Sequence, residues 1–126
     1  MGTELEPRVF RVTREDLVAY AAASGDHNPI HQDDAVARSV GLPGVIAHGM
    51  FTMALAARYV EEWAGRRGQV LTIGTKFTKP VPVPPEGAEV EIAGSYDDQG
   101  DDRVVTLTVT CGGEQVLGRF RATLRA

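Results

Sequence analysis

Apolar residues recur with a helical period in the first half of the chain and with a strand period in the second half. A short strand is predicted over residues 8–12. Thr13 and Asp16 then resemble a capping pair, so a helix is expected to begin directly after Thr13 and to stop near Gly25. A shorter helix is predicted within residues 33–41, where two aspartates favour the N-terminus and a glycine favours the end.

The longest helical segment runs from His48 to Gly65. It is apolar nearly all round between Met50 and Tyr59, which is typical of a buried helix. Its alanines would let another structural element approach closely. We therefore expect this helix to lie in the centre of the fold.

The pattern of the second half of the chain predicts an antiparallel sheet. Strands are predicted over residues 69–77, 88–96, 103–111 and 114–124. A two-residue hairpin loop is expected at Gly112-Gly113, and a longer acidic turn is expected over residues 97–102. The proline-rich stretch 79–87 should interrupt the sheet or run along its edge. Helices followed by strands indicate an α+β fold, with the long helix in the concave side of the sheet.

Composition narrows the functions that the chain can have. Its 126 residues suggest one domain, and its net charge of −4 without a basic stripe argues against nucleic acid as a partner. One cysteine excludes an intramolecular disulfide and makes a cysteine-based zinc site improbable. No secretory signal is visible, and the longest apolar stretch is too short to cross a bilayer. We expect a cytoplasmic protein without a membrane partner.

Residues 24–31, with the sequence SGDHNPIH, combine loop-forming residues with groups that carry chemistry. A metal site is one interpretation, with Asp26, His27 and His31 as ligands. The two histidines are four residues apart, which on a helix would bring them to one face. Pro29 lies between them and disfavours the helical conformation, so the spacing does not support a metal site.

Two further interpretations of this stretch stay open. In a structured turn, Asp26 and Asn28 would bond their own backbone, and the histidines would be incidental. In an acid–base site, Asp26 and His31 would point from the stiff loop into one cavity and move protons near neutral pH. Nucleophilic catalysis fits less well, because neither Ser24 nor Cys111 has the context of an activated nucleophile.

Residues 46–50, IAHGM, open the long helix, where free N–H groups and the positive end of the helix dipole meet. Gly49 has no side chain to keep a substrate oxygen from its amide. An amide held in this way can stabilise a developing negative charge. A plain helix start beside a glycine is the alternative.

These stretches together resemble a known family. Tyr20-x3-Ser24-Gly25-Asp26-x-Asn28-Pro29-Ile30-His31-x5-Ala37 is similar to the signature of the MaoC-like (R)-specific enoyl-CoA hydratases, and IAHGM is similar to that family's second motif. The likeness extends to the hydratase-type subunits of actinobacterial (3R)-hydroxyacyl-ACP dehydratases. It implies one hot-dog domain over residues 1–126, in which an antiparallel sheet wraps around the long central helix.

The resemblance also implies a mechanism. Asp26 and His31 would be the catalytic pair that holds a water molecule, and Asn28 would orient the pair. The amide of Gly49 would bind the thioester carbonyl oxygen. His27 occupies an open position of the signature and is expected to be structural or solvent-facing. The resemblance implies no cofactor and no metal ion.

The activity implied is the reversible hydration of trans-2-enoyl thioesters to (3R)-3-hydroxyacyl thioesters, carried on CoA or on acyl carrier protein. A hot-dog thioesterase and a non-catalytic acyl-binding subunit are the alternatives. The family implies a homodimer or a heterodimer with a second hot-dog subunit. Arg66 and Arg67 are expected to form a solvated helix end, with contact to a substrate phosphate as the alternative.

Overall fold

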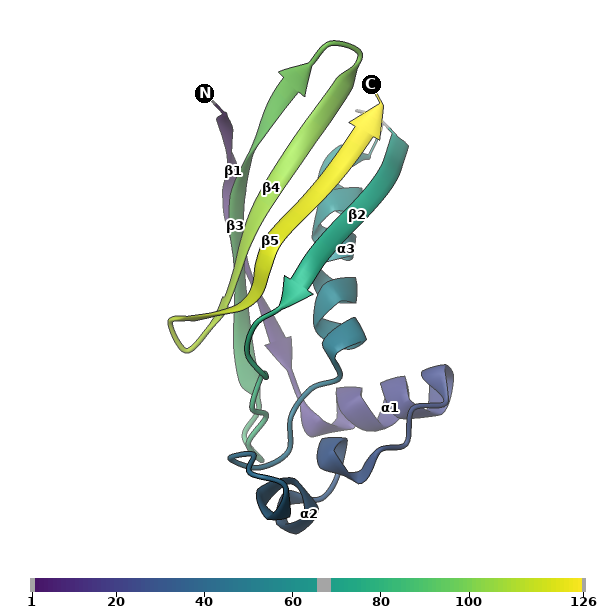
Figure 1. Cartoon of the computed structure of the whole chain (residues 1–126), viewed down its shortest axis with the longest axis vertical. Helices are drawn as coiled ribbons and strands as arrows, with labels where there is room; N and C mark the ends of the chain where they lie inside the picture. Colours follow the sequence, from purple (N-terminus) through teal and green to yellow (C-terminus); the bar gives the residue numbers. More distant parts are fainter. Residues whose placement is uncertain (1, 66–68, 126) are drawn as a thin grey trace.

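The protein, described by a computed structural model over residues 2–65 and 69–125, is an antiparallel sheet curved around a helix (Figure 1). The helical elements are α1 (Arg14–Ser24), a 3-10 turn (Pro29–His31), α2 (Asp34–Ser39) and α3 (Gly49–Ala64). The strands are β1 (Thr3–Val12), β2 (Gln69–Phe77), β3 (Ala88–Gln99), β4 (Asp102–Cys111) and β5 (Glu114–Arg125). Their order in the sheet is β1-β3-β4-β5-β2, which confirms the α+β prediction. Arg66 and Arg67 lie outside the described residues.

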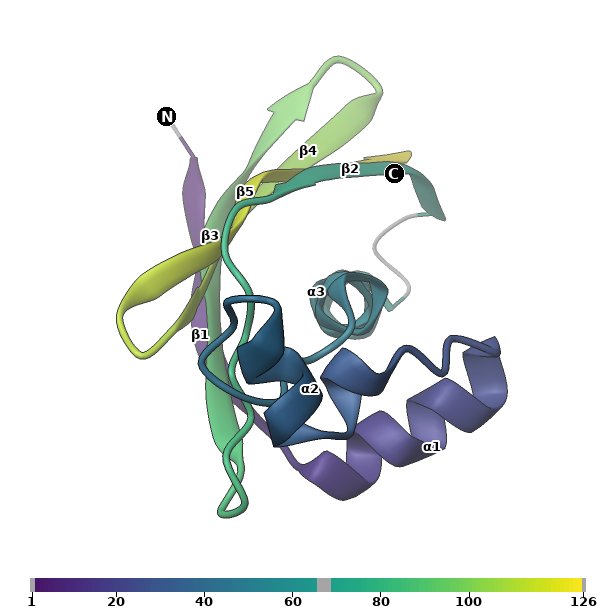
Figure 2. The same ribbon diagram turned by 60° about the horizontal axis from the view of Figure 1, so that its bottom comes forward.

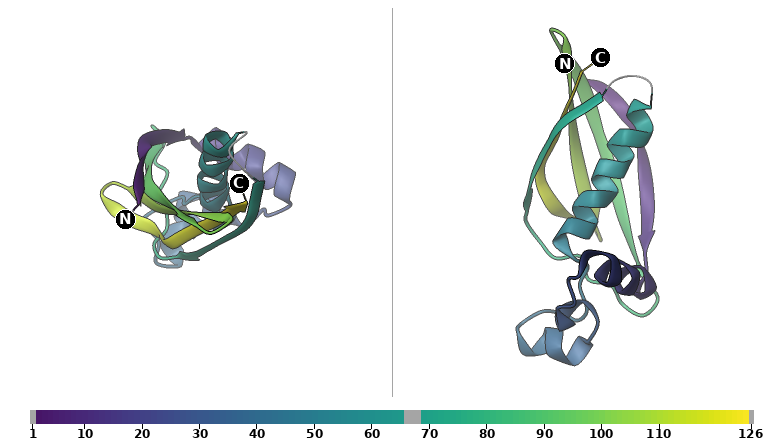
Figure 3. Two further views of the ribbon diagram at one scale, coloured as in Figure 1. Left: turned by 90° about the horizontal axis from the view of Figure 1, so that it is seen from above. Right: turned by 90° about the vertical axis from the view of Figure 1, so that its right-hand side faces the viewer.

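Helix α3 lies in the concave side of the sheet, as the sequence predicts (Figures 2 and 3). Its buried residues fall on the side that faces the strands: Thr52, Ala56, Tyr59, Val60 and Ala64. The helix is less buried than its apolar stretch predicts, because Met50 is 57% exposed and Ala54 is exposed. Within the described part of the chain, the one sheet covers one side of the helix, and α1 contacts its first turn through Tyr20 and Phe51. None of the helices in residues 2–65 and 69–125 is long and apolar enough to cross a membrane.

The sheet supplies the rest of the core by alternation. In β5 the side chains of Val116, Phe120, Ala122 and Leu124 are buried and their polar neighbours face outward, as predicted. The Gly112-Gly113 turn is confirmed, and both glycines have positive φ angles, of 60° and 81°, which suit a tight hairpin. The long turn expected over residues 97–102 is wrong, because β3 and β4 stay paired to Gln99–Asp102 and leave only two residues in the turn. An ion pair between Arg103 and Asp98 lets these charged residues remain in the ribbon.

The helix ends are fixed by the residues that the sequence indicated. Thr13 and Asp16 form a complete capping box at the start of α1, and Gly25 ends this helix in the left-handed conformation with φ 79°. Asp33 caps α2 by accepting hydrogen bonds from two backbone amides. β1 is longer than predicted, since it begins at Thr3 and pairs with β3 along most of its length. α1 and α2 both lie at the end of the sheet where α3 begins (Figure 3).

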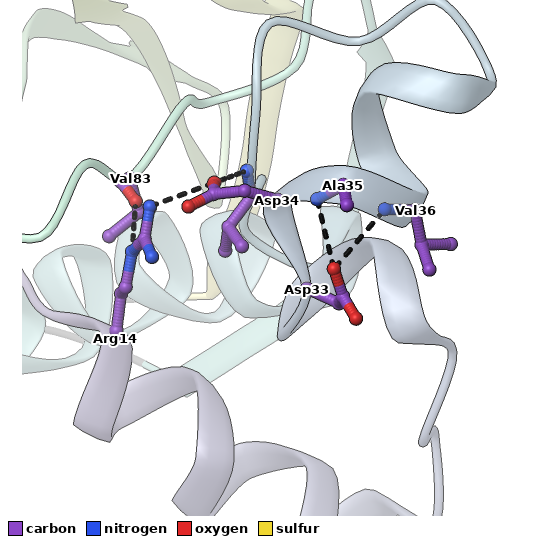
Figure 4. A network of polar contacts seen from close by, with 7 residues as sticks. Arg14, Asp33, Asp34, Ala35, Val36 and Val83 are labelled. Atoms are coloured by element: carbon purple, nitrogen blue, oxygen red, sulfur yellow. Dashed lines mark hydrogen bonds and ion pairs between the residues drawn. The ribbon is translucent and has the colours of Figure 1, made fainter.

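A polar network ties α1 and α2 to the two segments that lead into the sheet and into α3 (Figure 4). Arg14 donates from Nε to the carbonyl oxygen of Val83 at 2.8 Å and pairs with Asp34 at 2.9 Å. The same Asp34 oxygen accepts the amide of Val45 at 2.9 Å. Hydrogen bonding from Arg14, with that from the Val45 amide, holds the pKa of Asp34 below its usual value. The network fixes the backbone just before residues 46–50.

Candidate active site

The loop after α1 is shaped by side chains that bond to backbone amides two residues further along. The Ser24 hydroxyl accepts from the Asp26 amide, Asp26 Oδ1 accepts from the Asn28 amide, and Asn28 Oδ1 accepts from the Ile30 amide, each at 3.2 Å. This is the local bonding that the turn interpretation predicts. It also leaves the second carboxylate oxygen of Asp26 available, so the turn and the acid–base interpretations are compatible.

His31 ends this loop with its ring held against the segment before α3. It is 7% exposed, and its Nδ1 lies 2.8 Å from the carbonyl oxygen of Ile46. A carbonyl oxygen can only accept a hydrogen bond, so Nδ1 carries a hydrogen, and in the neutral ring Nε2 is the nitrogen with the lone pair. The Ile46 amide in turn donates to the carbonyl oxygen of Ile30 at 3.2 Å. The loop and the start of α3 are thereby joined on both sides of this imidazole.

His48 completes the site, and sequence reasoning missed it. It is 2% exposed, and its Nε2 lies 3.1 Å from the backbone carbonyl oxygen of Asp26. Its ring stacks on His31, with centroids 3.7 Å apart and planes inclined by 19°, and it also contacts the ring of Tyr20 at a centroid distance of 4.8 Å. The available signal was its place inside the IAHGM stretch, where only the neighbouring Gly49 was given a role.

Asp26, His31 and His48 form one cluster, in which each residue offers an atom within 4.8 Å of the atoms of the other two. The two imidazoles are buried and Asp26 is exposed. The cluster contains His48 in place of His27, which is exposed and belongs to the metal set that the loop sequence suggested. Three such groups could hold a metal ion or a water molecule.

Gly49 begins α3 and lines a cavity of about 280 Å³. The wall of this cavity is mostly apolar, with Ile46, Phe77, Val81 and Leu117, and Lys79 stands among them. A Cβ atom on Gly49 would lie 3.2 Å from the ring of Phe77, so the missing side chain also makes room for this phenyl group. Among the described residues, Asp26 and His31 are not part of the cavity wall. They approach the same helix end from the loop side.

The chain is similar to known proteins over most of its length. The family model described as "MaoC like domain" matches residues 1–114. The 3-hydroxyacyl-thioester dehydratase X of Mycobacterium tuberculosis is 40% identical over 93 residues, which cover 74% of this chain and 30% of that protein. The chain thus spans less than a third of the length of this curated relative.

Solved structures show the same architecture. A MaoC-like dehydratase matches with a TM-score of 0.93 and 36% identity, over 99% of this chain and 40% of that one. The R-hydratase PhaJ1 of Pseudomonas aeruginosa matches with a TM-score of 0.85 and 26% identity, over 100% of this chain and 81% of that one. The HadBC (3R-hydroxyacyl-ACP dehydratase) complex of Mycobacterium tuberculosis matches with a TM-score of 0.75 over 97% of this chain and 95% of that one. At 21% identity this last likeness shows the hot-dog fold alone.

Proposed function

The chain belongs to the MaoC-like domain family, and we propose that it catalyses the reversible hydration of trans-2-enoyl thioesters to (3R)-3-hydroxyacyl thioesters. The observation that carries the proposal is the convergence of the Asp26 carboxylate and the His31 imidazole within 4.8 Å of each other beside the start of α3. The likeness to a 3-hydroxyacyl-thioester dehydratase and to an R-hydratase supports it. The substrates are thioesters of CoA or of acyl carrier protein.

In the hydration direction, the water molecule lies between the Asp26 carboxylate and Nε2 of His31. Asp26 acts mainly as the base that removes a proton from this water, whose oxygen then bonds to Cβ of the enoyl thioester. The electron pair of the double bond moves toward the thioester carbonyl. His31 acts mainly as the proton carrier: its Nε2 accepts this proton from the Asp26 carboxyl group and delivers it to Cα. Dehydration follows the same steps in reverse.

The start of α3 supplies the place for the negative charge that develops on the thioester oxygen. The amide of Gly49 is in the first helical turn, where the helix dipole is positive and amides have no partner within the helix. His48 occupies the N-cap position without a side-chain capping bond. A donor placed in this way accelerates acyl chemistry by about 10²- to 10³-fold. Asn28 orients the catalytic pair through the loop, because its side chain holds the Ile30 amide.

We also propose that residues 1–126 form a single hot-dog domain. This domain pairs with a second hot-dog chain, which is either identical or different. Exposed apolar side chains near the start of α3 support the pairing, because Met50 in α3 is 57% exposed and Phe77 at the end of β2 is 55% exposed. A second layer packed there would remove these apolar side chains from water.

The proposal is tested with crotonyl-CoA, whose enoyl thioester absorbance is lost on hydration. The purified chain should remove this absorbance, and Asp26→Asn and His31→Gln should each lower kcat by about 10²-fold or more. His27→Gln is the matched control, since it changes an exposed histidine of the same loop and should leave the rate unchanged. Release of free thiol without loss of the double bond would instead identify a thioesterase. Full activity of Asp26→Asn would refute the proposed mechanism.

A further inference from the structure

His48 contacts both groups of the proposed catalytic pair at once. Its Nε2 donates to the backbone carbonyl of Asp26, and its ring face covers the ring of His31 at a centroid distance of 3.7 Å. The ring of Tyr20 also contacts His48, which is 2% exposed, so packing fixes the position of His48. Asp26 is itself exposed, and its other hydrogen bonds to described residues lie within its own loop.

The hydrogen-bond partners require opposite tautomers for the two stacked imidazoles. His31 donates through Nδ1 to Ile46, so its unprotonated nitrogen is Nε2. His48 donates through Nε2 to Asp26, so its unprotonated nitrogen is Nδ1. This Nδ1 is buried, and no residue within 2–65 and 69–125 forms a hydrogen bond with it. A buried polar atom without a partner is uncommon and calls for a functional explanation or a bound water molecule.

Helix capping and packing do not account for these features. Ser, Thr, Asp and Asn are the usual N-cap residues, and the His48 side chain makes no capping bond to α3. An aliphatic residue would fill the space beside Tyr20 and His31 without burying an unpartnered nitrogen. The imidazole of His48 supplies both a flat face against His31 and an N–H directed at the Asp26 carbonyl oxygen.

We propose that His48 is a positioning residue for the hydration reaction: its N–H holds the backbone of Asp26, and its ring sets the plane of His31. The inference rests on the proposed function and adds a third residue to that site. Loss of either contact lets one member of the pair move relative to the shared water molecule. A misplacement of about 1 Å can cost about 10²-fold in rate, so the effect should fall on kcat.

Two variants separate the two contacts. His48→Gln can keep an N–H near the Asp26 carbonyl but loses the ring, and His48→Phe keeps a ring but loses the N–H. Each should lower kcat by about tenfold or more with KM within about threefold, while His27→Gln leaves both constants unchanged. In an Asp26→Asn background, the same substitutions should have much smaller effects, because the group that they position is already disabled. Full rates in both variants, or losses that stay undiminished in that background, would overturn the proposal.

A second measurement needs neither activity nor a substitution. The chain has three histidines, so a protein labelled with ¹⁵N-histidine gives a spectrum in which each ring can be assigned. We expect His31 as the Nδ1–H tautomer and His48 as the Nε2–H tautomer at neutral pH. A His48 ring in the other tautomer would have no hydrogen to donate to Asp26 and would refute the proposal. A chain with these tautomers but without hydratase activity would refute only the proposed function.

Discussion

Replacing Gly49 by alanine should separate catalysis from stability. The new Cβ would lie 3.2 and 3.3 Å from two atoms of the Phe77 ring, which is a few tenths of an ångström inside the usual carbon–carbon contact of about 3.5–4.0 Å. Phe77 is 55% exposed, so its ring can shift toward solvent. The free energy of unfolding should therefore change by no more than about 0.5 kcal/mol.

The same methyl group lies beside the amide that we assign to the thioester oxygen. Loss of one such donor costs about 10²- to 10³-fold in kcat, or roughly 2.7–4 kcal/mol of activation free energy. The assay is the initial rate of crotonyl-CoA hydration, with urea unfolding of the same preparations. Gly74→Ala is the control, because a Cβ at that position would have no neighbour within 4 Å.

The role of the Phe77 ring is tested by a double variant. If Gly49→Ala acts by pushing this ring into the cavity, the smaller side chain of Phe77→Leu should restore the rate. If it acts at the amide, as we expect, the double variant should stay slow. A Gly49→Ala protein that keeps a rate within about threefold of the parent would refute the role of this amide as the main donor.

Two further predictions concern stability. Leu17 is fully buried in α1, so Leu17→Ala should lower the free energy of unfolding by about 2–5 kcal/mol in urea titrations, whereas Val18→Ala, at a 54% exposed neighbour, should change it by no more than about 0.5 kcal/mol. Hydrogen bonding to Arg14 lowers the pKa of Asp34 in the folded protein, so this contribution to stability is present above the ordinary pKa of 3.8 and is lost as the pH falls through the lower folded value. Asp34→Asn should reduce the difference between the urea midpoints at neutral pH and at about pH 3, and an unchanged difference would contradict this assignment.

The elements that the sequence predicted well are those with local causes. Thr13 and Asp16 cap α1 through bonds that span three residues, and Gly112-Gly113 supplies the positive φ angles that a tight turn needs. The acidic stretch 97–102 has the composition of a long hairpin turn, because aspartates are depleted in strands. Cross-strand pairing and the ion pair of Arg103 with Asp98 outweigh that preference, and neither is visible in a local pattern.

The site was predictable only as far as its residues are close in sequence. Asp26 and His31 share one loop, and their spacing was informative. His48 is 17 positions after His31 in the numbering, and its contacts with Asp26 and His31 arise from the way the loop packs on the start of α3. No periodicity relates these two segments. The exposed side of α3 was also unpredictable from the sequence. An apolar helix has the same hydrophobic pattern whether one or two layers of secondary structure pack on it.

The bonds that shape residues 24–31 each join a side chain to an amide two positions ahead, so this bend carries its own internal scaffold. A designer could graft these eight residues onto the end of an unrelated helix and expect the backbone to keep its path. Such a graft would lack the carbonyl of Ile46 and the ring of His48, and its imidazole would be free to turn. A graft that keeps the chemistry would therefore need residues 24–31 together with the segment that carries Ile46 and His48, held in a fixed relative position. Residues 24–31 alone would keep only their backbone conformation.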